Sequence, residues 1–361
     1  DFGDATVGRR GPTNLSNETR GLATGGKATG NVLQNVIDYI TIVSLGDATD
    51  FGDLLSAVWE SGGVASTTRG LIVGGEETDV IQYVTIASTG NATDFGDLST
   101  TNNYRSGSVS SNTRAVFHVG GYSSDLNTIE YVTIASTGNT TDFGDLTVAR
   151  GRVGGLSNGT RGVFGNGMLY AGGNNNTLDY ITIASTGDAV DFGDAALGTE
   201  NEGSHIAASN GHGGIDRSTA FATLPAAMGL LAGGYPESVI ESVDINTDGS
   251  SLIFGDLSQS RGYSFGGASN TTRGIFFGGY DGSTAYNIID YVTFGTKGKA
   301  LDFGDTLNTV YGTSGISNST RGVIGGGYGN ASGFDDNSHH NVIQYITIAS
   351  TGNATDFGDL S

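Results

Sequence analysis

Short runs of alternating apolar and polar residues recur along the chain at regular intervals. A typical run is Leu-Asp-Tyr-Ile-Thr-Ile at 178–183. Because successive side chains of a strand point to opposite faces, such alternation predicts a half-buried β-strand. Equivalent runs lie at 37–42, 81–86, 129–134, 240–245, 288–294 and 343–348.

The tetrapeptide Asp-Phe-Gly-Asp follows these runs and gives the chain its period. Copies begin at Asp1, Asp50, Asp94, Asp142, Asp191, Asp302 and Asp356, and a degenerate copy begins at Ile253. A period of about 50 residues indicates one supersecondary unit repeated along the chain. Units of this size cannot each bury a core, so the 361 residues predict one continuous body rather than two domains.

One repeat shows how the strands are connected. In the repeat 146–194, Asn158-Gly159 separates two strand-like runs, which is a strong hairpin signal because both residues accept positive φ. The run at 178–183 then follows, and Thr186-Gly187 turns the chain into the last strand. We name the four predicted antiparallel strands a, b, c and d. Four-stranded units repeated six to eight times close radially into a β-propeller, which leaves few exposed edges.

The repeat resembles the kelch repeat. The similarity lies in a glycine doublet at the end of strand b, a tyrosine in strand c and an aromatic residue in strand d, although strand d carries Phe where kelch repeats usually have Trp. The doublets include Gly74-Gly75, Gly120-Gly121, Gly233-Gly234, Gly278-Gly279 and Gly326-Gly327, and the tyrosines are Tyr39, Tyr83, Tyr131, Tyr180, Tyr291 and Tyr345. The resemblance implies an all-β, kelch-like β-propeller with four antiparallel strands per blade. Counting complete sets of strands a to d predicts a seven-bladed propeller, with blades at about 5–53, 54–97, 98–145, 146–194, 195–256, 257–305 and 306–359.

The copy at 1–4 is one strand d too many, because 356–359 already completes the last blade. It belongs either to a preceding element of a longer protein or to the ring itself, where it would displace the final strand. Both alternatives stay open at this point.

Sequence variation gathers at one end of the predicted blades. The a–b and c–d turns repeat, whereas the b–c loops range from four residues at 76–79 to fourteen at 328–341, and the longest d–a insertion is 195–227. Loops on a rigid scaffold commonly carry function, so this end is the predicted binding face, although loops also drift wherever they leave the fold intact. Candidate binding residues there, which could stack on sugars, contact a protein or simply pack the blade, are Tyr122, Tyr235, Tyr280, Tyr286, Tyr328, Phe334, Asp335, Asp336, His339 and His340.

The repeated carboxylates have a structural interpretation. A pair copied in every blade offers no asymmetry of environment that would separate an acid from a base, so we expect these residues to pair with the strand b arginines, with weak binding of a divalent cation as the alternative. This set comprises Asp50, Phe51, Asp53, Asp94, Phe95, Asp97, Asp142, Phe143 and Asp145, with Arg20, Arg69, Arg114, Arg161, Arg273 and Arg321.

Metal-binding signals are weak. Asp244, Asn246 and Asp248 match the first half of a calcium loop, but Gly255 stands at the twelfth position, where such loops have Glu. Adjacent histidines such as His339 and His340 point apart on a strand and rarely chelate one ion. Galactose oxidase shares kelch-type blades, but its copper site needs a Tyr–Cys crosslink and this chain has no cysteine. We expect no cofactor beyond a weak calcium site; further metal-capable residues on the same face are Glu200, Glu202, His205 and His212.

Charge and resemblance together suggest a function. A net charge of −21 disfavours nucleic acid, and no apolar run is long enough to span a membrane. The segment Thr-Ile-Ala-Ser-Thr-Gly-Asn-Ala-Thr-Asp-Phe-Gly-Asp occurs at both 85–97 and 347–359, and the chain has few lysines. These features resemble kelch-like proteins of tailed marine bacteriophages, which implies a non-enzymatic, extracellular module of a virion tail fibre that contacts other virion proteins and a host glycan or surface protein. Two alternatives stay open: a secreted glycan-active enzyme with its site in the propeller funnel, and a purely architectural capsid or appendage protein.

Overall fold

The computed structural model describes most of the chain. The described residues are 8–17, 19–42, 44, 47–76, 78–101, 107–120, 125–170, 175–199, 206–209, 228–233, 238–261, 266–329, 340 and 342–359. They contain no α-helix, and therefore no helix that is long and apolar enough to cross a membrane.

Seven four-stranded antiparallel sheets form the blades, and the strand order in each sheet follows the chain. Blade 1 contains β1 (Thr13–Ser16), β2 (Arg20–Thr24), β5 (Val36–Thr41) and β6 (Thr49–Asp53). Blade 2 contains β7 (Gly62–Ala65), β8 (Arg69–Gly75), β9 (Thr78–Thr85) and β10 (Thr93–Asp97). Blade 3 contains β11 (Ser108–Ser110), β12 (Arg114–His118), β13 (Leu126–Thr133) and β14 (Thr141–Arg150). Blade 4 contains β15 (Gly154–Ser157), β16 (Arg161–Gly165), β17 (Asn175–Thr182) and β18 (Val190–Thr199).

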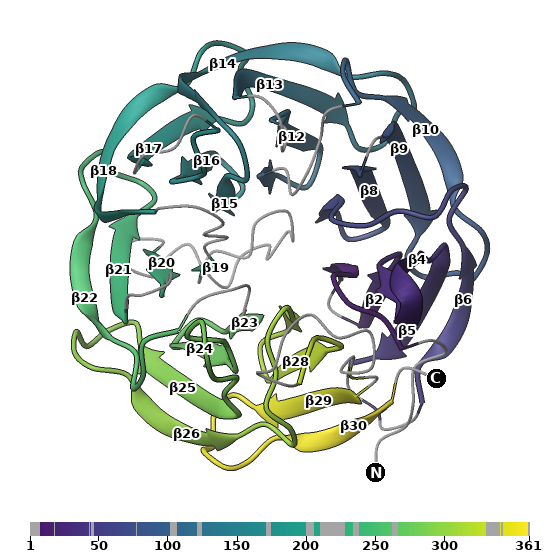
Figure 1. The fold of residues 1–361 in the computed structure, drawn as a ribbon. Helices are drawn as coiled ribbons and strands as arrows, with labels where there is room; N and C mark the ends of the chain where they lie inside the picture. Colours follow the sequence, from purple (N-terminus) through teal and green to yellow (C-terminus); the bar gives the residue numbers. More distant parts are fainter. Residues whose placement is uncertain are drawn as a thin grey trace.

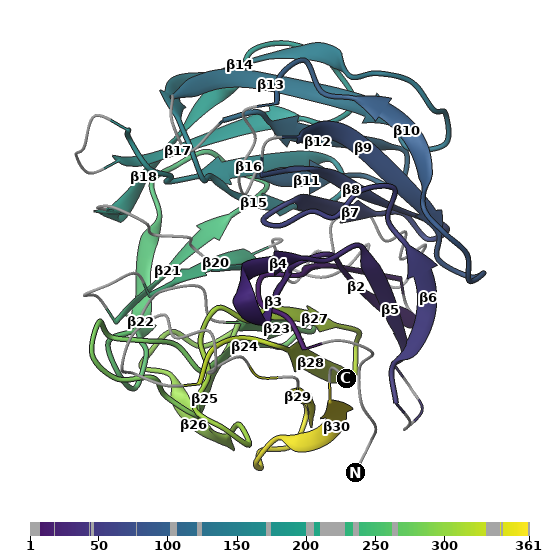
Figure 2. The same cartoon turned by 45° about the vertical axis from the view of Figure 1, so that its right-hand side comes forward.

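The remaining blades repeat this arrangement. Blade 5 contains β19 (Ile206–Ser209), β20 (Met228–Ala232), β21 (Val239–Asp244) and β22 (Leu252–Asp256). Blade 6 contains β23 (Gly266–Ser269), β24 (Arg273–Phe277), β25 (Ile288–Thr293) and β26 (Leu301–Asp305). Blade 7 contains β27 (Ser314–Ser317), β28 (Arg321–Gly325), β29 (Val342–Thr347) and β30 (Thr355–Asp359). A short hairpin of β3 (Lys27–Ala28) and β4 (Val32–Leu33), joined by the 3-10 turn η1 (Thr29–Asn31), extends the b–c loop of blade 1 (Figure 2).

The blades form a closed ring, seen down its axis in Figure 1, with the first strand of each blade near the axis and the last on the outside. This arrangement confirms the predicted all-β, seven-bladed β-propeller. One detail differs from the expected blade limits: β14 and β18 continue past the tetrapeptide to Arg150 and Thr199.

The ring closes between complete blades. Strand β30 pairs with β29, so the chain's own last strand occupies the outer position of blade 7 and is not displaced. Arg321 Nη1 of blade 7 donates to the carbonyl oxygen of Ile42 in blade 1 at 3.1 Å. Ile40 and Ala48 of blade 1 pack with Val323 and Ile343 of blade 7, and an apolar cavity of only about 30 Å³ remains in this seam.

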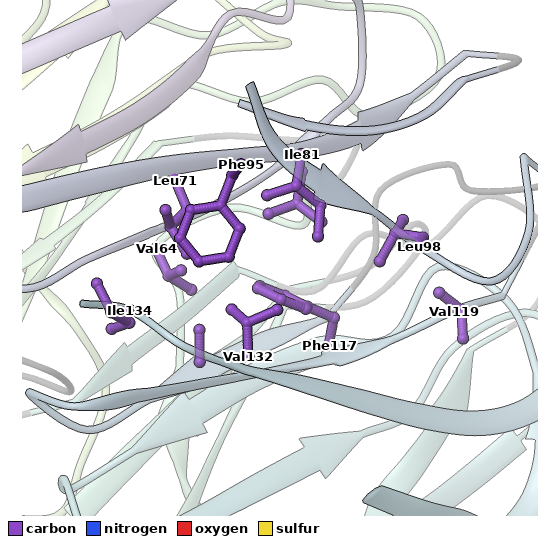
Figure 3. Close-up of a cluster of buried hydrophobic side chains, with 11 residues drawn as sticks. Val64, Leu71, Ile81, Phe95, Leu98, Phe117, Val119, Val132 and Ile134 are labelled. Atoms are coloured by element: carbon purple, nitrogen blue, oxygen red, sulfur yellow. The ribbon is translucent and has the colours of Figure 1, made fainter. Parts of the chain in front are cut away.

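The hydrophobic core lies between neighbouring blades. Figure 3 shows one such cluster, in which Phe95 and Leu71 of blade 2 face Phe117 and Val132 of blade 3. All four side chains are at most 4% exposed. Each blade therefore buries its apolar faces against the blades on either side, which is why a single repeat could not fold alone.

The repeated tetrapeptide joins each blade to the next. The carbonyl oxygen of Phe143 accepts the N–H of Gly187 at 2.7 Å, and that of Asp145 accepts the N–H of Ala189 at 2.8 Å. Gly144 has φ +144°, and a Cβ there would lie 2.5 Å from the Gly187 backbone. The glycine is thus required both by backbone conformation and by the close approach of the next blade's c–d turn.

The strand b arginines support the same junctions in a way that corrects the expected pairing with repeated aspartates. Each guanidinium lies over the strand c tyrosine of its own blade, as Arg69 does at 4.5 Å from the Tyr83 ring centre. In five cases Nη1 then donates to a main-chain carbonyl of the next blade; Arg69 reaches Ile134 at 2.9 Å. Arg161 instead contacts the Asp248 carboxylate at 2.7 Å. The repeat places a main-chain carbonyl at the same position in these blades. The repeated arginine can therefore donate to this carbonyl, and it needs no carboxylate partner.

Three buried ion pairs occupy positions that blades 2 and 7 fill with an uncharged pair. Arg150 Nη2, at the end of β14, lies 2.8 Å from Asp179 Oδ2 of blade 4, and both side chains are fully buried. Burial lowers the pKa of Arg150, and the charge of Asp179 opposes this shift. In blade 2 the same two positions hold Val58 and Gln82, which are also buried. The equivalent ion pairs in blades 1 and 6 are Arg9–Asp38 and Arg261–Asp290, and blade 7 carries Val310 and Gln344.

A buried histidine makes the stability of blade 3 depend on pH. Burial lowers the pKa of His118 from its ordinary 6.5 to about 4, and the charge of Arg150 adds to this effect. Since the unfolded chain binds this proton below pH 6.5 and the folded chain only near pH 4, stability falls as pH drops through that window, by about 3 kcal/mol in total.

We therefore expect His118→Val, which copies Val73 at the same position of blade 2, to remove this dependence. Urea unfolding of both proteins at pH 7, 5.5 and 4 measures it, and the variant should lose about 3 kcal/mol less than the parent over this range. Equal losses in both proteins would contradict the prediction.

Candidate functional site: the axial funnel

A cavity of about 380 Å³ lies where the first strands of the blades begin. Its walls come from residues 10–14 of blade 1, 59–63 of blade 2, 107–108 of blade 3, 152–155 of blade 4 and 312–313 of blade 7, together with Tyr328 of blade 7. The chain enters strand a from the rim formed by the d–a and b–c connections. The cavity is therefore a funnel on the rim where the loops vary, and its volume is typical of small-molecule sites.

The backbone at the funnel wall has the same unusual conformation in four blades. Two residues before strand a, Gly11 has φ +57°, Glu60 +56°, Arg152 +53° and Gly312 +66°. Non-glycine residues in this left-handed region cost roughly 1 kcal/mol or more and cluster at functional sites. Two blades thus keep a charged side chain where two others have glycine.

Aromatic rings and cations form a continuous stack along the funnel edge. Tyr280 of blade 6 stacks on Tyr311 of blade 7 at 4.8 Å, and Tyr311 stacks on Tyr328 at 5.4 Å. The Arg10 guanidinium of blade 1 lies 4.8 Å from the Tyr328 ring centre and 5.5 Å from that of Trp59 in blade 2.

Lys27 is a second cation at the Trp59 ring. Its Nζ lies 3.6 Å from the Trp59 ring centre and 2.8 Å from Glu76 Oε2. Four blades thus contribute to one ordered edge, which holds the planes of Trp59 and Tyr328 in fixed positions at the cavity.

Buried polar atoms at the funnel that lack a hydrogen-bond partner in the described structure include the hydroxyl of Thr313, whose residue is 6% exposed, and Oδ1 of Asn14. Both residues line the cavity. Buried polar atoms are nearly always satisfied, so water or a polar ligand is the expected partner of these two.

The structure assigns different surroundings to the predicted binding residues. Tyr328 lines the funnel and Tyr280 belongs to the aromatic stack. Tyr286 instead donates its hydroxyl to Asp281 Oδ2 at 2.6 Å, which fixes the b–c loop of blade 6 and raises the pKa of Tyr286. His340 packs against the backbone of Gly329. Tyr122, Tyr235, Phe334, Asp335, Asp336 and His339, as well as Glu200, Glu202, His205 and His212, lie outside the described residues.

The calcium candidates belong to the junction between blades 4 and 5. Asp248 Oδ1 binds Arg161 Nη1 at 2.7 Å, and its Oδ2 accepts the Tyr180 hydroxyl at 3.3 Å. Asn246 Oδ1 accepts the side-chain amide of Asn158 at 2.7 Å, and Asp244 Oδ1 accepts the N–H of Asn246 at 3.0 Å. A calcium ion would need these oxygens as ligands, but in the structure they accept hydrogen bonds that stabilise the blade junction.

Several funnel residues were absent from the candidates chosen from the sequence. Arg10, Trp59, Glu60, Arg152 and Tyr311 all lie in the d–a connections just before strand a, whereas the sequence reasoning favoured the b–c loops. One signal was available. At these positions an otherwise repetitive chain places its single tryptophan and non-repeated charges.

The comparisons with known proteins support the fold. No protein-family model matches the chain, and a search of curated proteins finds no match either. Solved structures do match, 627 chains in all, as expected for a widespread fold. One is a fungal alcohol oxidase of the AA5 family in complex with copper, with a TM-score of 0.58 and 12% identity. The match covers 80% of this chain and 62% of that chain, so this chain spans less than two thirds of its neighbour.

This comparison corrects the expectation that the chain is not an enzyme. The expectation treated the propeller as a binding scaffold, but an oxidase shares the architecture. The expectation rested on the repeated carboxylates of the blades, whereas the non-repeated charged and aromatic side chains line the axial funnel. At 12% identity the likeness establishes the fold alone.

A copper centre does not fit the described part of the funnel. Within the described ranges, no group of three or more His, Asp or Glu side chains is close enough together to hold a metal ion. Glu60 is the one carboxylate among the described lining residues. Glu60 and the aromatic edge can instead supply one acid–base group and a stacking surface.

Proposed function

We propose that the chain is a glycan-active enzyme whose substrate binds in the axial funnel. The observation that carries this proposal is the cavity of about 380 Å³ with Trp59 and Tyr328 held in place at its wall. Sugar rings bind through stacking on aromatic faces and through hydrogen bonds to their hydroxyls. The Thr313 hydroxyl and Asn14 Oδ1 are suited to the second role.

In this proposal Glu60 acts as the acid–base group. Glu60 is 7% exposed, it lines the cavity, and it adopts a left-handed backbone conformation at a position where blades 1 and 7 have glycine. Positioned carboxylates accelerate proton transfer by about 10²- to 10⁴-fold. The fungal oxidase of the same fold supports an enzyme on this scaffold.

The test is turnover of a panel of oligosaccharides, with products identified by mass so that hydrolysis, elimination and oxidation are distinguished. We expect one class to be converted, and Glu60→Gln to lower kcat by about 100-fold because it removes the acid–base group. Tyr170→Ala is the matched control, since Tyr170 is 59% exposed and lies in a b–c loop of the same rim without lining the cavity.

Two outcomes would contradict the proposal. One is the absence of any product from the whole panel. The other is conversion that Glu60→Gln leaves unchanged when its melting temperature equals that of the parent. A virion location and a host surface partner stay predictions, and a map of the intact particle would test them.

A further inference from the structure

The cations of the chain are distributed unevenly. The sequence has 16 Lys and Arg against 37 Asp and Glu. Six described arginines hold blade junctions and three form buried pairs with aspartate. Lys297 and Lys299 lie in the c–d turn of blade 6, on the rim opposite the funnel. The other described cations are Arg10, Lys27 and Arg152, and all three lie at the funnel.

We infer that the funnel recognises an anionic sugar, one that carries a carboxylate or a sulfate group. This inference rests on the proposed function and adds its substrate class. Arg10 and Arg152 line the cavity from different blades, and Glu60 is the one carboxylate among the described lining residues. The described part of the funnel wall thus has the opposite sign of charge to the molecule as a whole, whose net charge is −21.

Arg10 is positioned in advance for such a ligand. Its guanidinium lies near the rings of Tyr328 and Trp59, and its Nη2 donates to Asn31 Oδ1. Its backbone pairs with Lys27 in both directions at 2.9 Å. An arginine held by stacking loses little freedom on binding, and its planar N–H edge matches the paired oxygens of a carboxylate or sulfate.

Arg152 supplies the second positive group at an energetic cost to the fold. Its φ of +53° is one that Gly11 and Gly312 adopt at the same place without a side chain. Glycine would satisfy this backbone better, so the backbone conformation itself does not favour an arginine here. The arginine places a second positive charge at the cavity wall.

The decisive experiment follows Trp59 fluorescence, because Trp59 is the only tryptophan and lies at the cavity. The probes are an oligogalacturonate, a sulfated galactan oligosaccharide and a neutral galactan oligosaccharide of equal length. We expect one or both anionic probes to bind at least about tenfold more tightly than the neutral one in low salt, and this preference to shrink as NaCl rises.

Arg152→Gly isolates the charge, because glycine suits the backbone and the variant should fold. It should reduce affinity for the preferred anionic probe about tenfold and leave the neutral probe unchanged. Lys297→Gln, on the opposite rim, is the control and should change neither. If the carboxylated and sulfated probes differ, the difference identifies the anion.

Each contrary result has a distinct meaning. Equal binding of neutral and anionic probes would overturn the inference and leave the proposed function standing. An anionic preference that persists both in Arg152→Gly and in its double variant with Arg10→Gln would overturn it as well, because the funnel cations would not be responsible. Binding of none of the probes, combined with no turnover in the oligosaccharide panel, would overturn both.

Discussion

Gly144→Ala is expected to lower the free energy of unfolding by about 2–6 kcal/mol, through two additive causes. Alanine at φ +144° is strained by about 1–3 kcal/mol, and its Cβ would lie 2.5 Å from the Gly187 backbone. Backbone cannot move aside as a flexible side chain would, so overpacking adds about 1–3 kcal/mol. Urea unfolding measures the total.

Gly187→Ala separates these two causes. Gly187 has a similar φ of +151°, but a Cβ there meets nothing within 4 Å. This variant should therefore show the conformational cost alone and be more stable than Gly144→Ala by about 1–3 kcal/mol.

Hydrogen exchange at the N–H groups of Gly187 and Ala189, which bind the carbonyls of Phe143 and Asp145, should accelerate chiefly in Gly144→Ala. Equal destabilisation by both substitutions would show that the tetrapeptide glycine is required by backbone conformation alone and not by the approach of the neighbouring blade.

Arg150→Val is the second change with a large expected effect, about 3–5 kcal/mol of lost stability. The substitution leaves the Asp179 carboxylate buried without the guanidinium that lies 2.8 Å from it. Removing one member of a buried pair strands a charge in a low-dielectric interior, which is much more costly than losing the pair. Thermal and urea unfolding measure the loss.

The double variant Arg150→Val with Asp179→Gln should recover most of this stability, to within about 1–2 kcal/mol of the parent. It copies Val58 and Gln82 of blade 2, where Gln82 Oε1 accepts the N–H of Leu55 at 2.5 Å. Blade 7 repeats this solution with Val310 and Gln344. A double variant no more stable than Arg150→Val would show that the surroundings of blade 4 require the charges.

Much of the architecture could be predicted from the amino-acid sequence because it is local and repeated. Alternation in runs such as 178–183 specifies a strand with one buried face, and Asn158-Gly159 specifies a hairpin turn. Repetition every 50 residues or so made closure into blades the economical solution, and the seven sheets confirm it. The role of the tetrapeptide glycine could not be predicted from the sequence, because the glycine is required by contact with a turn of the next blade. For Gly144 that turn contains Gly187, 43 residues away.

The funnel was decided only by the tertiary structure. Arg10, Trp59, Glu60, Arg152 and Tyr328 are scattered over more than 300 residues, and no local pattern marks them as neighbours. Ring closure places the starts of the first strands around one axis. Non-repeated residues from separate blades therefore lie next to one another and form the wall of one cavity. The sequence by itself determined the repeating blade, since alternation and turn chemistry act within a few residues. Only the tertiary structure decided which non-repeated residues become neighbours, because residues far apart in the sequence come together only when the seven blades pack into a ring.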